Sequence, residues 1–225
     1  MIKLTYIGHS AFLISDGTNV LAVDPFITGN PTAKIKQADI NPNFIFVTHA
    51  HDDHLGDTIE LAKKNNATVI AVNDLAVYLS SKGIKTHPLH IGGEFAFPFG
   101  SIKLTIAHHS SMSTEGGYMG APCGGIITIG GKKIYHTGDT GLFLDMQLIG
   151  EISKPDVMLL PIGNNFTMGI DDAVRAVEFV KPKLAIPMHY DTFMIIKADP
   201  NDFVRKVKAN NFDARVMEFG ETIEL

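Results

Sequence analysis

Short apolar runs separated by glycine and polar residues occupy the beginning of the chain. They predict four β-strands, at residues 2–7, 11–14, 20–23 and 44–47, because β-branched and aromatic side chains suit the half-buried surface of a sheet. Asp24-Pro25 ends the third of these strands, since proline cannot donate a ladder hydrogen bond. The chain therefore begins as a sheet.

The first helices are predicted after the fourth strand. Asp57 followed by Glu60 matches a capping box and predicts a helix through about Lys64. A strand over residues 68–72 and a short helix over residues 74–81 are predicted next. Strands and helices therefore alternate in this part of the chain.

Alternation and a glycine pair predict further strands in the middle of the chain. Ile102, Leu104 and Ile106 alternate with polar residues, which predicts a strand over residues 101–107. Gly130-Gly131 separates two short apolar runs, at residues 126–129 and 133–135, and such a pair is typical of a two-residue β-hairpin.

The C-terminal part mixes strands with two longer helices. Apolar residues recur at helical spacing over residues 170–180, and Pro182 ends this predicted helix. Strands are predicted on either side of it, at residues 157–160 and 184–187, and Asp199 with Pro200 opens a final helix. We therefore expect an α+β chain with two sheets and outer helices, forming one domain over residues 1–225.

Composition and charge narrow the class of protein. Hydrophobic residues make up 45% of the 225 residues, which supplies a core and excludes a disordered chain. The formal net charge of −5 opposes nucleic-acid binding, which needs a basic surface. The first ten residues lack the apolar segment of a secretory signal and no run is long enough to span a membrane, so we expect neither a leader nor a membrane span. The single cysteine, Cys123, excludes an intrachain disulfide. We expect a cytoplasmic protein that acts on a small molecule, has no nucleic-acid or membrane partner, and is compatible with an oligomer.

One short segment concentrates potential metal ligands. Residues 49–54 read His-Ala-His-Asp-Asp-His and directly follow the predicted strand 44–47. Side chains alternate in an extended segment, so His49 and His51 share one face and can bind one ion. Asp53 and His54 lie beyond the strand, where a turn toward a helix can direct them to a second ion. The spacing therefore predicts the start of two adjacent metal sites.

The segment resembles the signature of the metallo-β-lactamase superfamily, whose fold is a four-layer αβ/βα sandwich with a dinuclear metal site between its sheets. Three downstream residues match the rest of that signature, each after a predicted strand: His109, Asp139 and His189. The segments at residues 8–12, 135–140, 168–169 and 187–190 are more narrowly similar to the UPF0173 group of small metal-dependent hydrolases.

The resemblance implies a complete ligand set. The first ion would bind His49, His51 and His109, the second would bind Asp53, His54 and His189, and Asp139 would bridge the two. Asp53 and Asp139 are then expected to be catalytic as well as metal-binding. The cofactors expected are two divalent transition-metal ions, with zinc first and Mn, Fe, Ni or Co also suited to imidazole and carboxylate ligands.

The same resemblance implies hydrolysis by a hydroxide held between the two ions. The substrates compatible with this chemistry are phosphodiesters or phosphate esters, lactones and thioesters. Two alternatives share the fold: a di-iron redox protein and a non-catalytic metal-binding sensor. The single cysteine offers no redox relay, and the intact ligand positions oppose a sensor.

Other residues are candidates for the surroundings of the site. Four are predicted substrate contacts, although each fits a structural role equally well: His9, Tyr118, Asn164 and Tyr190. His136 is expected to orient Asp139, and Asp52 is expected to point away from the ions.

His108 and His109 cannot both reach one ion easily, because neighbouring strand side chains point to opposite faces. Simple alternation would put His108 on the face of Leu104, and a turn at the strand end can redirect either histidine. The resemblance selects His109, since the histidine followed by Ser-Ser matches the third ligand of the family.

Overall fold

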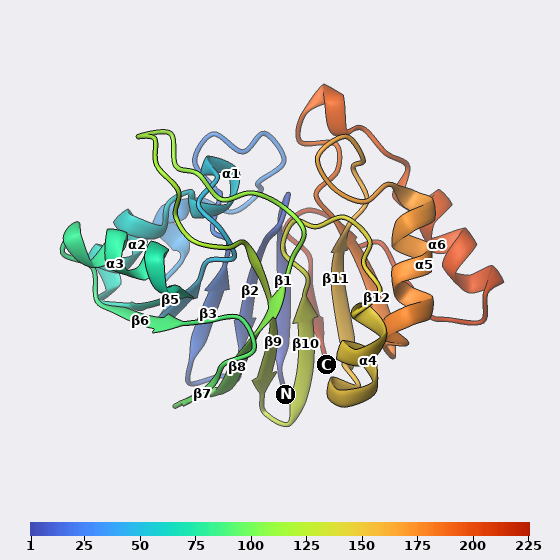
Figure 1. Cartoon of the computed structure of the whole chain (residues 1–225), viewed down its shortest axis with the longest axis horizontal. Coiled ribbons are helices and arrows are strands. Elements are labelled where there is room, and N and C mark those ends of the chain that lie inside the picture. Colours follow the sequence, from blue (N-terminus) through green and yellow to red (C-terminus); the bar gives the residue numbers. More distant parts are fainter.

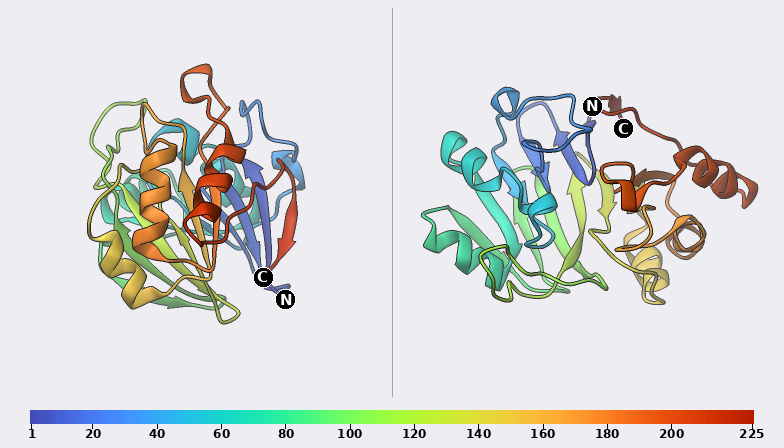
Figure 2. Two further views of the ribbon diagram at one scale, coloured as in Figure 1. Left: turned by 90° about the vertical axis from the view of Figure 1, so that its right-hand side faces the viewer. Right: turned by 90° about the horizontal axis from the view of Figure 1, so that it is seen from above.

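Two mixed β-sheets lie face to face at the centre of the computed structural model, which describes residues 1–225, and helices cover both outer faces (Figure 1). This arrangement is the predicted four-layer α+β sandwich. The chain termini lie close together, because β13 pairs with β1 at one edge of the first sheet (Figure 2).

The first sheet has seven strands in the order β13-β1-β2-β3-β4-β5-β6. Its N-terminal strands pair antiparallel, whereas β3 to β6 run parallel. The strands are β1 (Lys3–Gly8), β2 (Ala11–Ser15), β3 (Val20–Val23), β4 (Phe44–Phe46), β5 (Thr68–Val72), β6 (Thr86–Leu89) and β13 (Thr222–Glu224). The helices of this half are the 3₁₀-helix η1 (Gln37–Asp39), α1 (Asp52–Leu55), α2 (Thr58–Asn65) and α3 (Asn73–Ser81).

The second sheet has six strands in the order β12-β11-β10-β9-β8-β7. The strands are β7 (Glu94–Phe97), β8 (Gly100–Ile106), β9 (Cys123–Ile129), β10 (Lys132–His136), β11 (Val157–Pro161) and β12 (Leu184–Met188). The helices of this half are α4 (Met146–Ser153), α5 (Ile170–Val180), the 3₁₀-helix η2 (Met194–Ile196) and α6 (Pro200–Ala209). The three α-helices lie side by side on the outer face of this sheet (Figure 2).

Period-2 alternation along the strands separates the central core from the two outer cores. Tyr6 and Phe46 pack into the cluster between the sheets, whereas their neighbours Ile7 and Ile45 pack into the cluster beneath α2 and α3. A third cluster lies beneath the helices of the second sheet. Central strands such as β5 and β11 are buried on both faces and are therefore apolar on both sides.

The structure confirms the predicted strands and helices to within a few residues at their ends. Gly130 and Gly131 form the predicted tight turn between β9 and β10, with φ angles of 54° and 78°, which glycine adopts at little cost. The sequence pattern missed α4, β7 and β13. β6 is a strand in spite of Pro88, which cannot donate a ladder hydrogen bond.

The predicted capping box at Asp57 is wrong in detail. Asp57 precedes α2, but its side chain makes no capping bond to that helix. Its Oδ2 accepts hydrogen bonds from the backbone N–H groups of Ile27 (2.9 Å) and Thr28 (2.8 Å). The long-range contact replaces the local one, and the carboxylate thereby ties the loop after β3 to the start of α2.

One edge of the sandwich collects α1 and the loops that follow β8, β10 and β12, all at the upper side of Figure 1. These segments carry the predicted metal ligands. None of the helices has the length and apolar character that crossing a membrane requires.

Candidate metal centre

The ligand-rich segment after β4 changes direction at His51. β4 ends at Phe46, and His51 has extended angles (φ −65°, ψ 147°) immediately before the one-turn helix α1. His49 and His51 meet on one side, with Nε2 of His49 2.9 Å from Nδ1 of His51. The helical turn then sends Asp53 and His54 toward β1 and β12. The local geometry is therefore the one expected from the spacing.

His109 completes a group of three imidazoles with His49 and His51. Its Nε2 lies 3.3 Å from Nδ1 of His51, although the two residues are 58 positions apart in the chain. One nitrogen from each of the three rings lies within 4.8 Å of the others, which is close enough to hold one metal ion.

Asp139, which follows β10, lies between this group and a second one. Its Oδ1 is 3.2 Å from Nε2 of His54, and its Oδ2 is 2.9 Å from Nε2 of His189 and 3.7 Å from Nε2 of His109. Gly138 permits this placement, because a Cβ there would lie 2.4 Å from the carbonyl oxygen of Cys123 and its φ is +62°. The carboxylate can therefore contact ions in both groups.

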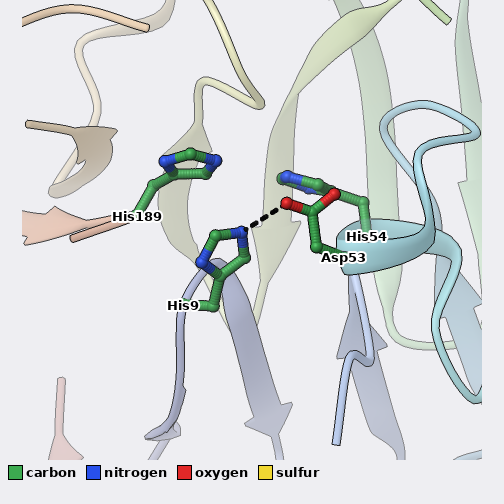
Figure 3. Close-up of side chains that lie close together, drawn as sticks. All are labelled: His9, Asp53, His54 and His189. Atoms are coloured by element: carbon green, nitrogen blue, oxygen red, sulfur yellow. Dashed lines mark hydrogen bonds and ion pairs between the residues drawn. The ribbon is translucent and has the colours of Figure 1, made fainter. Parts of the chain in front are cut away.

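The second group consists of His9, Asp53, His54 and His189, whose ligand atoms also lie within 4.8 Å of one another (Figure 3). Asp53 and His54 come from α1, His189 from the end of β12, and His9 from the turn between β1 and β2. All three histidines are buried, whereas the Asp53 side chain is 27% exposed.

His54 lies between two carboxylates that oppose the effect of burial on its pKa. Burial alone would lower the pKa of His54, but the carboxylates of Asp139 and Asp24 outweigh burial and raise it well above the ordinary value. Burial likewise opposes ionisation of Asp139, yet His189 and His54 hold the pKa of Asp139 well below its usual range. The charges around these two residues therefore favour the protonated form of His54 and the ionised form of Asp139.

The three imidazoles of the first group are biased toward the neutral form. Burial lowers the pKa of His49, His51 and His109, and the charge of nearby His54 lowers them further. A neutral imidazole keeps one nitrogen lone pair, which is the form that binds a metal ion.

Asp24 is a residue of the site that the sequence pattern missed. It is fully buried at the end of β3, where its Oδ2 lies 2.7 Å from Nδ1 of His54 and 2.7 Å from Oγ1 of Thr48. Its Oδ1 accepts the backbone N–H of Thr48 at 2.8 Å. A carboxylate on the far nitrogen of a histidine fixes the orientation and tautomer of the ring. Asp24-Pro25 reads locally as a strand end, so only the position of β3 beside β4 could have revealed this role.

The donor set fits a transition-metal ion. His54 Nε2 and Asp139 Oδ1 are buried and form no hydrogen bond, although they lie 3.2 Å apart. Buried polar atoms are rarely left without a partner, and a cation would satisfy both. Imidazole and carboxylate ligands without thiolate suit zinc, manganese, iron, nickel or cobalt.

The structure separates the two adjacent histidines. His109 joins the cluster with a side chain that is 12% exposed, whereas His108 is exposed and stacks on Phe143 with ring centroids 4.9 Å apart. The backbone N–H of His108 donates to Oγ1 of Thr140 (2.9 Å), which bends the chain after β8. This turn overrides the simple alternation of the strand.

The remaining predicted residues lie in different surroundings. His136 is buried, donates to the carbonyl of Ser10 (3.0 Å) and accepts the N–H of Gly138 (3.2 Å), so it supports the turn that carries Asp139. Tyr190 is packed in the core beneath the outer helices, which places its ring among apolar side chains. Asn164 and Tyr118 are exposed on loops.

Two other polar residues are not part of the cluster. Asp52 is exposed and accepts from Oγ1 of Thr114 (3.3 Å), as expected for a residue that points away. Cys123 is buried, its thiol donates to the carbonyl of Thr48, and burial together with the charge of Asp24 raises its pKa. A buried neutral thiol is not a nucleophile.

Separate alanine substitutions of the two neighbouring histidines test which of them belongs to the first group. His109→Ala is expected to weaken binding of one metal ion and abolish hydrolysis, because it removes one of only three imidazoles that converge there. His108→Ala is the matched control and should keep the metal content and much of the activity. Elemental analysis of both reconstituted variants checks this, and the reverse pattern would shift the assignment by one residue.

Comparison with known proteins identifies the class that this fold and site define. A family profile described as a beta-lactamase superfamily domain matches residues 3–189, which includes every candidate ligand. The match covers every strand of both sheets except β13, together with the edge on which the cluster lies.

Relatives of the same length narrow the class. The chain is 49% identical to a UPF0173 metal-dependent hydrolase of Carboxydothermus hydrogenoformans and 50% identical to one of Anoxybacillus flavithermus, with all of each chain covered. It superposes on Igni18, a metallo hydrolase of the archaeon Ignicoccus hospitalis, with a TM-score of 0.92 and 42% identity over 100% of this chain and 99% of the other. The chain therefore belongs to the beta-lactamase superfamily and, within it, to the UPF0173 metal-dependent hydrolases.

Proposed function

We propose that this hydrolase holds two transition-metal ions on seven side chains. His49, His51 and His109 would hold one ion, Asp53, His54 and His189 the other, and the two oxygens of Asp139 would serve both. The observation that carries the proposal is the position of Asp139, with one oxygen 3.2 Å from His54 and the other within 3.7 Å of both His189 and His109. A single carboxylate facing two imidazole groups suits a bridging ligand.

Two such ions, when bound, supply an activated water and positive charge for the oxyanion that develops on the substrate. The protein's own part is to hold the donors in place. Asp24 aligns the His54 ring, and His136 and Gly138 hold the turn of Asp139. Since Cys123 is a buried neutral thiol, we propose direct attack by water, without a covalent enzyme intermediate.

We further propose a carbonyl substrate, such as a lactone or thioester, that carries an apolar group. Seven large apolar side chains are exposed on the loops after β8, β10, β11 and β12: Met112, Tyr118, Leu144, Phe166, Phe193, Met194 and Ile195. The ring of Phe193 lies 5.6 Å from that of His9, which places this member of the apolar set at the edge of the cluster. No Lys or Arg pairs with Asp53 or Asp139, so the centre lacks the fixed cations that favour a phosphate.

A substrate series measures the contribution of the apolar loops. With zinc-loaded protein and γ-lactones of increasing alkyl length, we expect kcat/KM to rise about 3–4-fold for each methylene that becomes buried. Phe193→Ala should flatten this slope, and Val77→Ala, which alters an exposed apolar residue on α3, is the control. Faster hydrolysis of a phosphodiester such as bis-p-nitrophenyl phosphate than of every lactone and thioester would contradict the substrate proposal.

The metal count tests the proposal itself. Protein stripped with a chelator and dialysed against zinc is expected to bind two ions per chain, and each of Mn, Fe, Ni and Co can be compared in the same way. Hydrolysis should disappear on stripping and return on reconstitution. A stoichiometry of one ion or fewer, with full activity, would overturn the dinuclear proposal.

Metal uptake should depend on pH through His54. The raised pKa of His54 favours its protonated form in the metal-free protein, so we expect an ion on Nε2 to displace a proton. The apparent affinity should therefore rise by about tenfold per pH unit until the pH exceeds that pKa. Calorimetry in two buffers with different ionisation enthalpies should detect about one proton released. Metal uptake that does not change between about pH 6 and 8 would contradict this role of His54. That pH range extends ~1 unit around an ordinary histidine pKa.

A further inference from the structure

His9 lies in the candidate metal centre, yet the seven proposed ligands do not include it. It is fully buried in the turn between β1 and β2, and its ring centroid lies 4.1 Å from that of His189 and 5.5 Å from that of His54 (Figure 3). A buried polar ring among proposed ligands has either a ligating or a supporting role.

The main chain of His9 is held from two sides. Its carbonyl oxygen accepts the hydroxyl of Tyr6 at 2.9 Å and the backbone N–H of His189 at 2.8 Å. The turn is thereby tied to β12, and the ring is placed at a constant distance from His189. The φ of His9 is 57°, a conformation that asparagine tolerates better than most other residues.

The two ring nitrogens have different partners. Nδ1 lies 2.9 Å from Oγ1 of Thr192, which is buried, and Nε2 lies 3.1 Å from Oδ2 of Asp53. An ionised carboxylate can only accept a hydrogen bond, whereas a hydroxyl can donate or accept. This pairing puts the hydrogen of the ring on Nε2, and the Thr192 hydroxyl, which also lies 3.4 Å from the carbonyl oxygen of Tyr190, donates to Nδ1 at the shorter distance of 2.9 Å.

In this assignment Nε2 of His9 donates its hydrogen to Asp53, so the ring supports a proposed ligand and is not itself placed on the ion. The assignment also identifies the hydrogen-bond donor to the Asp53 carboxylate. The Asp53 carboxylate lies on a one-turn helix, is partly exposed, and has His9 as its single hydrogen-bond partner in the protein. Without that bond, its side chain would be free to rotate.

We propose that His9, held in one tautomer by Thr192, is a positioning residue that orients the Asp53 carboxylate toward the second metal ion. One oxygen of Asp53 is occupied by the His9 N–H, which leaves the other for the ion. The inference rests on the proposed dinuclear site, and it assigns Thr192 to the site as well.

Two substitutions of His9 separate this role from a merely structural one. In His9→Gln the amide nitrogen reaches about as far as Nε2 and keeps a donor toward Asp53. In His9→Asn the shorter amide reaches the position of Nδ1, but asparagine suits the positive φ better than glutamine does. Positioning of Asp53 therefore ranks Gln above Asn in metal affinity, whereas a turn-forming role ranks Asn above Gln.

The readout is zinc binding to the metal-free proteins, measured by competition with a chromophoric chelator. We expect His9→Ala and His9→Asn to lower the affinity for one of the two ions by about 10–100-fold, the usual effect of losing a partner of a metal ligand. His9→Gln should recover most of that loss. Thr192→Val, which removes the hydroxyl at nearly constant volume, should weaken the same ion, and Thr192→Ser should not.

The outcomes distinguish this inference from the proposed function. If the unsubstituted protein binds fewer than two zinc ions, the dinuclear proposal fails and the inference fails with it. If it binds two, but His9→Asn binds both as tightly as His9→Gln does, His9 does not position Asp53. Should the His9 variants fail to fold, equal zinc affinities for Thr192→Val and Thr192→Ser would overturn the inference in the same way.

Discussion

Replacing Asp139 by alanine is expected to remove both metal ions and all measurable hydrolysis. Its oxygens lie close to His54 and His189 of the second group and to His109 of the first, so its loss removes a ligand from both groups. The loss of zinc affinity should exceed the ~10–100-fold effect of changing an outer partner. Elemental analysis and chelator competition measure the occupancy, and the hydrolysis of a thioester measures the activity.

Asp52→Ala is the matched control for this change. Asp52 belongs to the same histidine-rich segment, but it is exposed and points to Thr114. It should retain two ions and its activity. If Asp139→Ala kept one ion at undiminished affinity, Asp139 would serve a single site and would not be a bridge.

Replacing Asp24 by alanine is expected to lower the free energy of unfolding of the metal-free protein by about 3–5 kcal/mol, the usual cost of breaking a buried ion pair by removing one partner. The change leaves the N–H and hydroxyl of Thr48 and Nδ1 of His54 without their acceptor, all in a fully buried setting. Urea unfolding of the metal-free proteins measures the difference without the contribution of bound ions.

Asp16→Ala is the control that separates the effect of burial on stability from the effect of losing hydrogen bonds. The Asp16 carboxylate also accepts two backbone N–H groups, from Thr18 at 2.8 Å and Asn19 at 2.6 Å, but it lies in a surface turn. Its loss should cost only about 1 kcal/mol, since water replaces the lost partner. Equal losses for Asp16→Ala and Asp24→Ala would show that the buried ion pair adds nothing to stability.

The loss of Asp24 should also affect the ring that it holds. One of the two carboxylates that raise the pKa of His54 would be absent, so that pKa should fall toward its ordinary value. NMR titration of the His54 ring in Asp24→Asn, which preserves the side-chain volume, would detect the change. An unchanged titration would assign the raised pKa to Asp139 alone.

Local patterns predicted most of the strands because those strands are buried on at least one face and therefore carry a run of apolar residues. They failed where the reason for a strand lies elsewhere in the chain. β13 has only three residues, of which Ile223 alone is partly buried, and it forms by pairing with β1 more than 200 positions away. Likewise, Asp57 has the spacing of a cap, but its bonds go to the loop after β3.

The sequence by itself determined the class of this protein and the residue types of its centre, because the four ligand candidates at residues 49–54 are neighbours whose spacing directly implies geometry. The tertiary structure alone decided which distant residues support them. His109 rather than His108 turns inward because Thr140 binds the backbone after β8, and Asp24 reaches His54 because β3 lies beside β4. His9 meets Asp53 and Thr192 only when β1, α1 and the loop after β12 converge. Hydrogen bonds of this kind depend on distances of about 3 Å between residues far apart in the chain, and no local pattern encodes such distances.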